Sequence, residues 1–326
     1  MVLAFTPEVS SALINDRRVF LITGATGWLG RALAEMLHCA LGQKFTQRVI
    51  LCGSRQQTMT LGDGTLVPVH ELSGATRLLG GRPAWLFHFA FLTKDRVGSL
   101  SDQEYMERNR KISGVAASIV EDGNVSGVML ASSGAVYDHL LGGKRDSAAS
   151  LYGMLKAEDE SRFETACADR GVQLVVPRIF NLSGPCMNKF DAYALSAIIV
   201  DVLRGGPIRL RANKPVVRSY FYIGDLFELC VRCLTDESAR GSAIRFDTAG
   251  SEAIEVGELA VRVRSALSQP SMPIERSPVN PDSEDRYVGD AAGLNVLLAR
   301  YAVAPLPLDV QIAATADYIR HALGAR

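Results

Sequence analysis

The chain of 326 residues carries 35 basic and 35 acidic side chains, for a formal net charge of +0, and 48% of its residues are hydrophobic. This length is enough for one large domain or two unequal ones, each with a core of its own. A balanced charge without a long basic run argues against a nucleic-acid partner. No apolar run approaches the ~18 residues that span a bilayer, which argues against a membrane protein.

Residues 1–18 lack the basic lead and the long apolar stretch of a signal peptide, and we interpret them as a short extension before the first strand. The cysteines are scattered through apolar or helical surroundings and show no zinc spacing; they are Cys39, Cys52, Cys167, Cys186, Cys230 and Cys233. We therefore expect reduced thiols, a cytoplasmic location and no metal site.

The first half of the chain alternates short apolar runs with longer amphipathic ones. After a strand at 19–22, residues 28–41 place their apolar side chains on one helical face, and the helix ends at Gly42. Further strands are predicted at 49–51, 67–69, 85–89, 128–130 and 174–176. Apolar strands separated by helices predict an α/β fold of the Rossmann type, with a doubly wound parallel sheet covered on both faces.

After Phe180 this alternation changes, with a long helix predicted at about 189–203 and a proline-rich stretch at 270–281. These segments predict a smaller C-terminal lobe that binds the substrate at the carboxyl ends of the strands. A strand predicted at 243–246 returns the chain to the sheet, so the lobes are interleaved. We expect a dinucleotide-binding domain at 1–181 with a return segment at 219–250, and a substrate-binding lobe made of 182–218 and 251–326.

A glycine-rich loop joins the first strand to the first helix. Gly24 permits a sharp turn, Gly27 lets backbone amides approach a pyrophosphate, and Gly30 lets the helix pack against the strand. In this context the loop predicts dinucleotide binding. The cofactor-binding residues expected here are Gly24, Thr26, Gly27, Trp28, Leu29 and Gly30.

The end of the second strand bears on which dinucleotide is bound. An NAD enzyme usually has an acid about 20 residues after the glycines, which holds the ribose 2′-hydroxyl. This chain has Gly53, Ser54 and Arg55 instead, and a guanidinium suits a 2′-phosphate. We expect Ser54 and Arg55 to bind the cofactor and NADP to be preferred, with NAD still possible; alternatively, Arg55 stacks on adenine or points to solvent.

Three side chains indicate hydride chemistry on an alcohol or ketone. If residues 152–156 are helical, Tyr152 and Lys156 lie one turn apart on the same face, so the ammonium favours the anion of the phenol. This turns a group with a pKa of ~10 into a usable proton carrier at neutral pH. Ser133, upstream of this pair, adds a hydroxyl, and together with the glycine loop these residues suggest hydride transfer.

Six motifs in order give the chain a family resemblance from about Arg18 to its C-terminus. It resembles the extended short-chain dehydrogenase/reductases of the NAD(P)-dependent nucleotide-sugar epimerase/dehydratase family. The motifs are the glycine loop, His88-Phe89-Ala90-Phe91, Ala131-Ser132-Ser133-Gly134-Ala135-Val136-Tyr137, the Tyr152 to Lys156 segment, Pro177-Arg178-Ile179-Phe180-Asn181-Leu182-Ser183-Gly184-Pro185, and Arg218-Ser219-Tyr220-Phe221-Tyr222-Ile223-Gly224-Asp225.

The resemblance implies a role for each catalytic side chain. Tyr152 would be the acid/base, Lys156 would bind the nicotinamide ribose and tune Tyr152, and Ser133 would hydrogen-bond the reacting oxygen. Further residues expected beside the cofactor are Glu71, Leu72, Phe89, Ala90, Phe91 and Asn109, the last of which matches a structural asparagine of the family. The family also implies a homodimer built through a four-helix bundle.

The same resemblance implies a nucleotide-diphosphate sugar as substrate. Arg218 and Arg286 match positions that grip the diphosphate, for which two guanidinium forks are suited. Asn181 would reach the sugar or its first phosphate. The alternative for both arginines is a surface ion pair, with Asp225 or Asp285 as the partner.

The residues after Ser133 depart from one pattern of the family, and this reduces the number of reactions that we expect. The 4,6-dehydratases place an Asp-Glu pair directly after the serine or threonine, whereas Gly134-Ala135 follow Ser133 here. We therefore expect a 4-ketoreductase or a 4-epimerase. Two alternatives stay open, namely an NADPH-dependent reductase of a non-sugar ketone and a non-catalytic NADP-binding sensor.

Overall fold

The computed structural model describes residues 3–93, 99–141 and 148–324. The chain forms two compact units that exchange segments. The larger contains Ala4–Ile179 and Phe227–Phe246, and the smaller contains Phe180–Leu226 and Asp247–Arg326 together with the start of the chain. Within the described ranges, no helix combines the length and the apolar character needed to cross a membrane.

The larger unit is built on one sheet with the strand order β13-β8-β6-β5-β1-β2-β4-β3, to which β7 adds beside β8. Neighbouring strands in the series β8-β6-β5-β1-β2-β4 are all parallel, and β3 runs antiparallel to β4 at the edge of the sheet. The strands are β1 (Val19–Thr23), β2 (Val49–Gly53), β3 (Gln57–Thr60), β4 (Leu66–Glu71), β5 (Ala84–His88), β6 (Val125–Leu130), β7 (Ser132–Ser133), β8 (Gln173–Ile179) and β13 (Ala243–Asp247).

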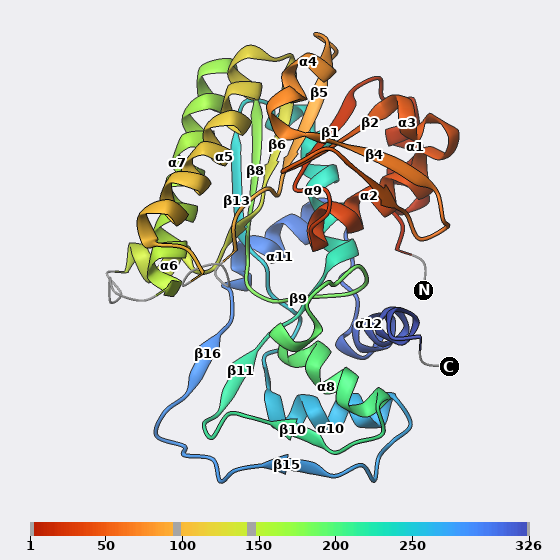
Figure 1. Cartoon of the computed structure of the whole chain (residues 1–326), viewed down its shortest axis with the longest axis vertical. Helices are drawn as coiled ribbons and strands as arrows, with labels where there is room; N and C mark the ends of the chain where they lie inside the picture. The colour runs from red at the N-terminus through yellow and green to blue at the C-terminus, as the bar shows by residue number, and fades with distance from the viewer. Residues whose placement is uncertain (1–2, 94–98, 142–147, 325–326) are drawn as a thin grey trace. The chain divides into compact units, whose positions relative to one another are not determined.

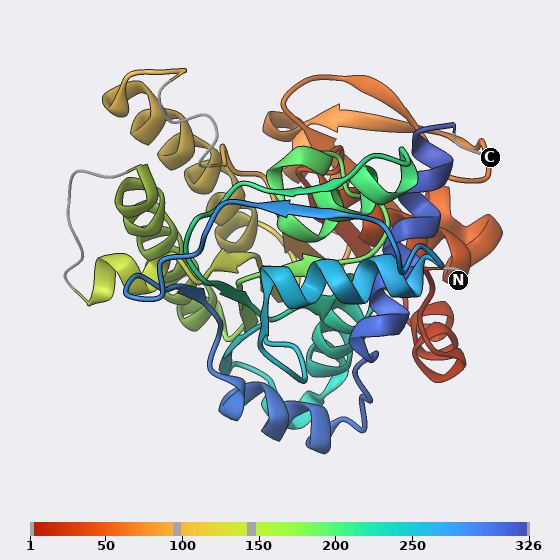
Figure 2. The same cartoon turned by 90° about the horizontal axis from the view of Figure 1, so that it is seen from below.

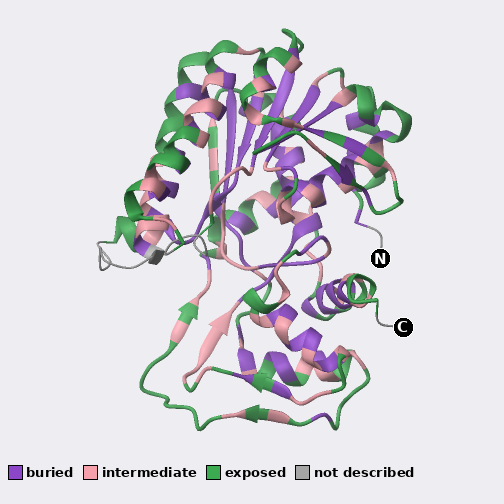
Figure 3. Ribbon diagram, viewed as in Figure 1, coloured by how far each residue is buried: buried purple, intermediate pink, exposed green. Residues whose placement is uncertain are grey.

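Helices cover the sheet, and every residue of β1, β2 and β5 is buried, as Figure 3 shows in purple. Burial on both faces explains why these strands are continuous apolar runs. Figures 1 and 2 both show α5 beside α7. The helices that belong wholly or mainly to this unit are α1 (Pro7–Asn15), α2 (Trp28–Leu41), α3 (Phe45–Arg48), α4 (Ala75–Leu79), α5 (Asp102–Asp122), α6 (Val136–Leu140), α7 (Ala148–Arg170) and α9 (Ile223–Thr235). The expectation of a doubly wound Rossmann-type sheet is confirmed.

The N-terminal extension differs from the expectation because it contains the helix α1. Thr6 caps this helix by accepting a hydrogen bond from the amide of Val9, and a proline follows at the first helical position. The Thr6 hydroxyl also donates to the carboxylate of Glu228 at 2.6 Å. Burial of Val9 and Leu13 completes the attachment of α1 to the larger unit.

The smaller unit has its own core, made by α8, α10 and α12 with the short strands beside them. The helix predicted at 189–203 begins later, at Ala194, because Tyr193 is extended and the Ser196 hydroxyl donates to the carbonyl oxygens of Phe190 and Tyr193. The elements are α8 (Ala194–Leu203), α10 (Val256–Ala266), α11 (Ala291–Arg300) and α12 (Leu308–Ala322), with β9 (Leu182–Ser183), β10 (Ile208–Leu210), β11 (Val216–Arg218), β12 (Phe221–Tyr222), β14 (Ile254–Glu255), β15 (Ile274–Arg276) and β16 (Asp285–Tyr287).

Candidate active site

The glycine loop between β1 and α2 is packed too tightly for side chains at two of its positions. Gly24 has φ +66°, and a Cβ there would lie 2.7 Å from the backbone nitrogen of Ala90. A Cβ at Gly30 would lie 2.4 Å from the carbonyl oxygen of Gly24. Both glycines are thus required by close backbone approach. Helix α2 begins at Trp28, directly after Gly27, so its first amides lie at the loop.

Thr23 and His88 support this loop from beneath and were not predicted from the sequence. The Thr23 hydroxyl oxygen accepts hydrogen bonds from the amides of Phe89 and Ala90, at 3.1 and 3.2 Å. Its proton is then free to be donated to Nδ1 of His88, 2.7 Å away, which places the ring proton on Nε2. The threonine therefore fixes the Phe89-Ala90 backbone, which we expect beside the cofactor.

Asn109 holds the chain just beyond Phe91. Its side-chain oxygen accepts a hydrogen bond from the amide of Leu92 at 2.8 Å, and the Tyr105 hydroxyl donates to the carbonyl oxygen of Leu92 at 2.6 Å. Asn109 and Tyr105 are both buried in α5. Two side chains of one helix therefore fix the backbone after β5.

The carboxyl end of β2 combines the predicted basic residue with an acid from the next strand. Ser54 and Arg55 are exposed after Gly53, and Arg55 makes no ion pair with any residue in the described ranges. The β2–β4 register sets Gly53 opposite Glu71, whose carboxylate accepts a hydrogen bond from Ser73. The end of β2 has no acidic residue of its own, but the sheet places the Glu71 carboxylate of β4 beside it.

Ser133 ends the short strand β7, which pairs with β8 opposite Ile179. Its hydroxyl oxygen accepts a hydrogen bond from the amide of Ala135 at 3.2 Å. Helix α7 packs directly on this turn, because a Cβ added to Gly153 would lie 2.1 Å from the carbonyl oxygen of Ala135. Gly153 is next to Tyr152 in sequence, so this contact brings the turn of α7 that carries Tyr152 against the Ser133 loop.

Lys156 is buried one turn after Tyr152 in α7. Its ammonium donates to the carbonyl oxygen of Ala131 at 2.9 Å and lies 3.5 Å from a carboxylate oxygen of Asp159. The ring of Phe91 covers it at 3.7 Å from Nζ to the ring centroid. Burial lowers the pKa of Lys156, and the charge of Asp159 acts in the opposite direction. The Phe91 ring also meets the Tyr152 ring edge-on, with centroids 5.6 Å apart.

A second polar network holds β7 through Ser132, the residue before Ser133. Arg178 in β8 makes a two-pronged ion pair with Glu160, at 3.0 and 2.8 Å, and donates to the Tyr137 hydroxyl at 3.0 Å. The Ser132 hydroxyl donates to the same Glu160 carboxylate. The hydrogen bonds that Arg178 donates to Glu160 and Tyr137 raise its pKa. These contacts join α7, β7 and β8 around Ser133.

In the smaller unit, the two predicted arginines lie on neighbouring strands and point to opposite faces. Arg218 of β11 pairs with Tyr287 of β16, whereas Arg286 pairs with Val217. Arg218 donates to the carbonyl oxygens of Val217 and Asp285 and forms an ion pair with the Asp285 carboxylate at 3.1 Å. Arg286 is 55% exposed and lies 3.6 Å from Glu284. The structure does not bring these two arginines together.

Asn181 directly follows Phe180 and contacts Tyr287, the strand partner of Arg218. Its side-chain nitrogen donates to the carbonyl oxygen of Tyr287 at 3.1 Å. The ring of Phe180 packs on the Tyr287 ring, with centroids 4.6 Å apart. Asn181, Tyr287 and Arg218 therefore belong to one connected set of residues.

The chain is similar in structure to several nucleotide-sugar enzymes. A UDP-N-acetylglucosamine 4-epimerase from Methanobrevibacter ruminantium is 16% identical over 94% of this chain and 99% of its own, with a TM-score of 0.73. A UDP-glucose 4-epimerase from Thermus thermophilus, solved with NAD, is 22% identical over 93% and 99%, with a TM-score of 0.70. TunA, an NAD-dependent NDP-hexosamine 5,6-dehydratase of tunicamycin biosynthesis, is 17% identical over 93% and 98%, with a TM-score of 0.68.

These identities establish a shared fold. No curated protein matches in sequence. The sequence pattern of the NAD dependent epimerase/dehydratase family matches residues 20–246, which is most of the chain. The glycine loop and the Tyr152 to Lys156 turn lie within that match, as do all strands of the large sheet except the outermost residues Val19 and Asp247. The chain belongs to the NAD dependent epimerase/dehydratase family and is an enzyme.

Proposed function

We propose that this enzyme oxidises or reduces a hydroxyl or keto carbon of a nucleotide-diphosphate sugar, as a 4-epimerase or a 4-ketoreductase. The observation that carries the proposal is the contact of Gly153 with Ala135, which sets Tyr152 and Lys156 of α7 against the turn after Ser133. Helix α7 then supplies the proton donor Tyr152 and the cation Lys156 that tunes it. The adjoining strand β7 supplies the Ser133 hydroxyl for the reacting oxygen.

In the proposed reaction, the bound dinucleotide supplies or accepts the hydride. Tyr152 takes the proton from the substrate hydroxyl at its phenolic oxygen during oxidation and returns it during reduction. The Ser133 hydroxyl donates a hydrogen bond to the reacting oxygen and orients it. Lys156 keeps the Tyr152 phenolate favourable through its charge, and it is the residue that would hold the nicotinamide ribose by a hydrogen bond.

For the cofactor we propose the glycine loop as the pyrophosphate site and NADP as the preferred dinucleotide. The exposed Arg55, without an ion-pair partner among the described residues, suits a 2′-phosphate. Glu71, opposite Gly53, is the group that would favour NAD, by accepting from a ribose hydroxyl. The family is described as NAD dependent. In this chain, we propose that the preference between NADP and NAD depends on the relative strength of the Arg55 and Glu71 contacts.

For the substrate we propose that Arg218 and Asn181 bind the diphosphate and the adjoining sugar. Arg218 is already held within the protein by Asp285 and by two carbonyl oxygens, which fixes its position. The same contacts favour a second candidate, a reductase of an uncharged ketone, in which Arg218 has only a structural role. The Gly134-Ala135 sequence after Ser133 lacks the Asp-Glu pair of the 4,6-dehydratases, so we do not propose a dehydratase of that kind.

Nucleotide binding separates the two candidates. With NADP or NAD present, one of UDP, dTDP, GDP, CDP and ADP should bind in calorimetry and raise the melting temperature, since a ligand specific to the folded state stabilises it. Arg218→Leu should weaken that binding by ~1.5–3 kcal/mol, the range for a hydrogen bond to a charged group. Arg209→Leu, an exposed arginine of the same unit that pairs with Glu275, serves as the control. If none of the five binds while a neutral ketone is reduced, the nucleotide-sugar proposal is wrong.

A further inference from the structure

The ammonium of Lys156 needs a counter-ion because it is buried in the larger unit. Its side chain is 6% exposed, and burial favours the neutral amine. The proposed reaction requires the charged form, which favours the Tyr152 phenolate. A positively charged lysine in this position therefore depends on a negative charge nearby.

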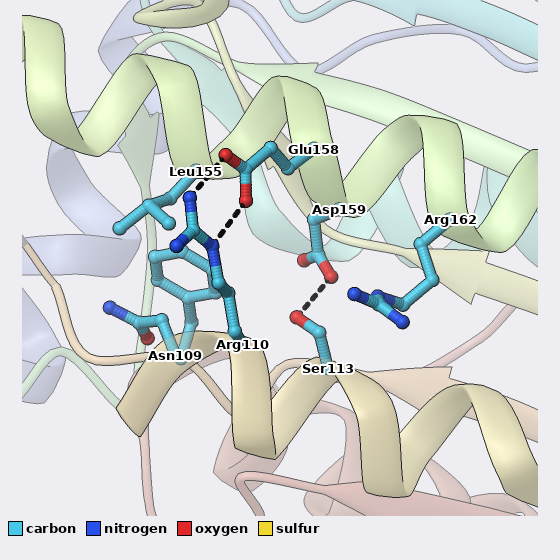
Figure 4. Close-up of a pocket in the computed structure, with 8 residues that line it drawn as sticks. Asn109, Arg110, Ser113, Leu155, Glu158, Asp159 and Arg162 are labelled. Carbon is cyan, nitrogen blue, oxygen red and sulfur yellow. Dashed lines mark hydrogen bonds and ion pairs between the residues drawn. The ribbon is translucent and has the colours of Figure 1, made fainter. Parts of the chain in front are cut away.

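Asp159 is the carboxylate that faces Lys156. It lies one turn further along α7, is 1% exposed, and has one oxygen 3.5 Å from Nζ. Its other oxygen accepts a hydrogen bond from the Ser113 hydroxyl of α5, as Figure 4 shows. The oxygen that faces Lys156 makes no hydrogen bond with a described residue, so that ion pair is its polar contact. Asp159 is therefore anchored by α5 on one side and directed at Lys156 on the other.

The other charged groups around this pair are engaged elsewhere. On α7, Glu160 is held by Arg178 of β8, and Glu158 is held by Arg110 of α5. His88 of β5 is buried, and its pKa falls to about 4 because burial penalises the charged ring, so it is neutral at pH 7. Arg162 of α7 lines the same small cavity as Asp159 but is exposed to solvent, and within the described residues it forms no ion pair with Asp159.

We propose that Asp159, anchored by Ser113, is a positioning residue that keeps Lys156 charged and fixed beside Tyr152. This inference rests on the proposed function for its catalytic consequence, but the ion pair can be tested without turnover. Asp159 acts through Lys156 and is not itself placed against the reacting atoms.

The pH profile tests the catalytic consequence. Asp159→Asn removes the charge and can keep the hydrogen bond from Ser113, so the alkaline limb of kcat/KM should move down by about one pH unit or more as Lys156 loses its proton earlier. Ser113→Ala removes the hydrogen bond and keeps the charge, so its alkaline limb should stay where it is. Glu158→Gln removes a neighbouring carboxylate paired with Arg110 and should leave the profile unchanged. An unmoved limb in Asp159→Asn overturns the proposal.

Thermal unfolding tests the pair independently of any substrate. Lys156→Met leaves Asp159 buried without its counter-ion and should lower the melting temperature by about 5 °C or more. Adding Asp159→Asn to Lys156→Met should recover most of that loss, because no uncompensated charge is left. If the second substitution lowers the melting temperature further, Asp159 is not the counter-ion. If the melting temperature recovers in this way but the unmodified enzyme turns over no nucleotide sugar, the ion pair stands and the proposed reaction is wrong.

Discussion

Tyr152 is the residue on which the proposed proton transfer depends. Tyr152→Phe should lower turnover by ~10² or more and leave dinucleotide affinity nearly unchanged, because it removes a proton donor and little binding energy. Lys156→Ala should reduce both quantities. Steady-state rates and calorimetric cofactor binding measure the difference, with Tyr193→Phe, an exposed tyrosine of the smaller unit, as the control. Near-normal turnover by Tyr152→Phe would show that the assigned mechanism is wrong.

Arg55 is the residue on which the cofactor prediction depends. NADPH should bind more tightly than NADH, and Arg55→Ala should remove most of the difference by withdrawing the guanidinium from the 2′-phosphate. Arg17→Ala serves as the control, because it removes the same charge. Arg17 lies just before the amino end of β1, whereas Arg55 follows the carboxyl end of β2, so this substitution should leave the preference for NADPH intact. Equal or tighter binding of NADH by the unmodified enzyme would contradict this prediction and favour a dominant role for Glu71.

The contrast between the predicted residues and the supporting ones has a physical reason. Gly24 and Tyr152 stand in local motifs, so the sequence alone identified them as candidates. Thr23 and His88 act through contacts 65 to 67 residues apart in sequence, which no local pattern reveals. The separation of Arg218 from Arg286 depends on the β11–β16 register, and sequence spacing carries no information on it.

At the level of elements, the strands of the large sheet were predicted because burial on both faces makes them continuous apolar runs. The predicted strands at 19–22 and 49–51 correspond to β1 and β2 with the ends extended by one or two residues. Edge strand β3 was missed, because its alternating burial leaves a polar sequence. Helix α1 was missed because it is short, and its position depends on distant contacts of Thr6 and Glu8.

Gly153 tests whether the packing of α7 on the Ser133 turn matters for activity. Gly153→Ala places a Cβ 2.1 Å from the carbonyl oxygen of Ala135, so the helix must shift; we expect a loss of about 1–3 kcal/mol of stability and a lower turnover. Gly114→Ala in α5 meets nothing within 4 Å and should instead stabilise by about 0.5–1 kcal/mol, the helix preference for alanine. Denaturant unfolding and rates measure both. A Gly153→Ala enzyme as stable and active as the unmodified one would contradict the proposed assembly.

At the level of the whole molecule, buried titratable groups link folding stability to pH. His88 lies under the glycine loop with its Nδ1 bonded to Thr23, and its ring stacks on Phe163, with centroids 5.0 Å apart. Burial lowers its pKa from 6.5 to about 4. Between these values the unfolded chain binds a proton that the folded chain does not, so the His88 contribution to stability is present above pH 6.5 and is lost as the pH falls toward 4.

The two pKa values of His88 set the expected change in stability with pH. Between pH 7 and pH 5, protonation of His88 in the unfolded chain should cost the enzyme about 2 kcal/mol of unfolding free energy. His88→Gln keeps a neutral polar side chain and cannot titrate, so the stability gap between it and the unmodified enzyme should narrow by that amount in urea unfolding at the two pH values. A gap for His88→Gln that does not change with pH would mean that the folded protein accommodates a charged His88, and that the Thr23 hydroxyl does not donate to Nδ1 as the loop geometry indicates.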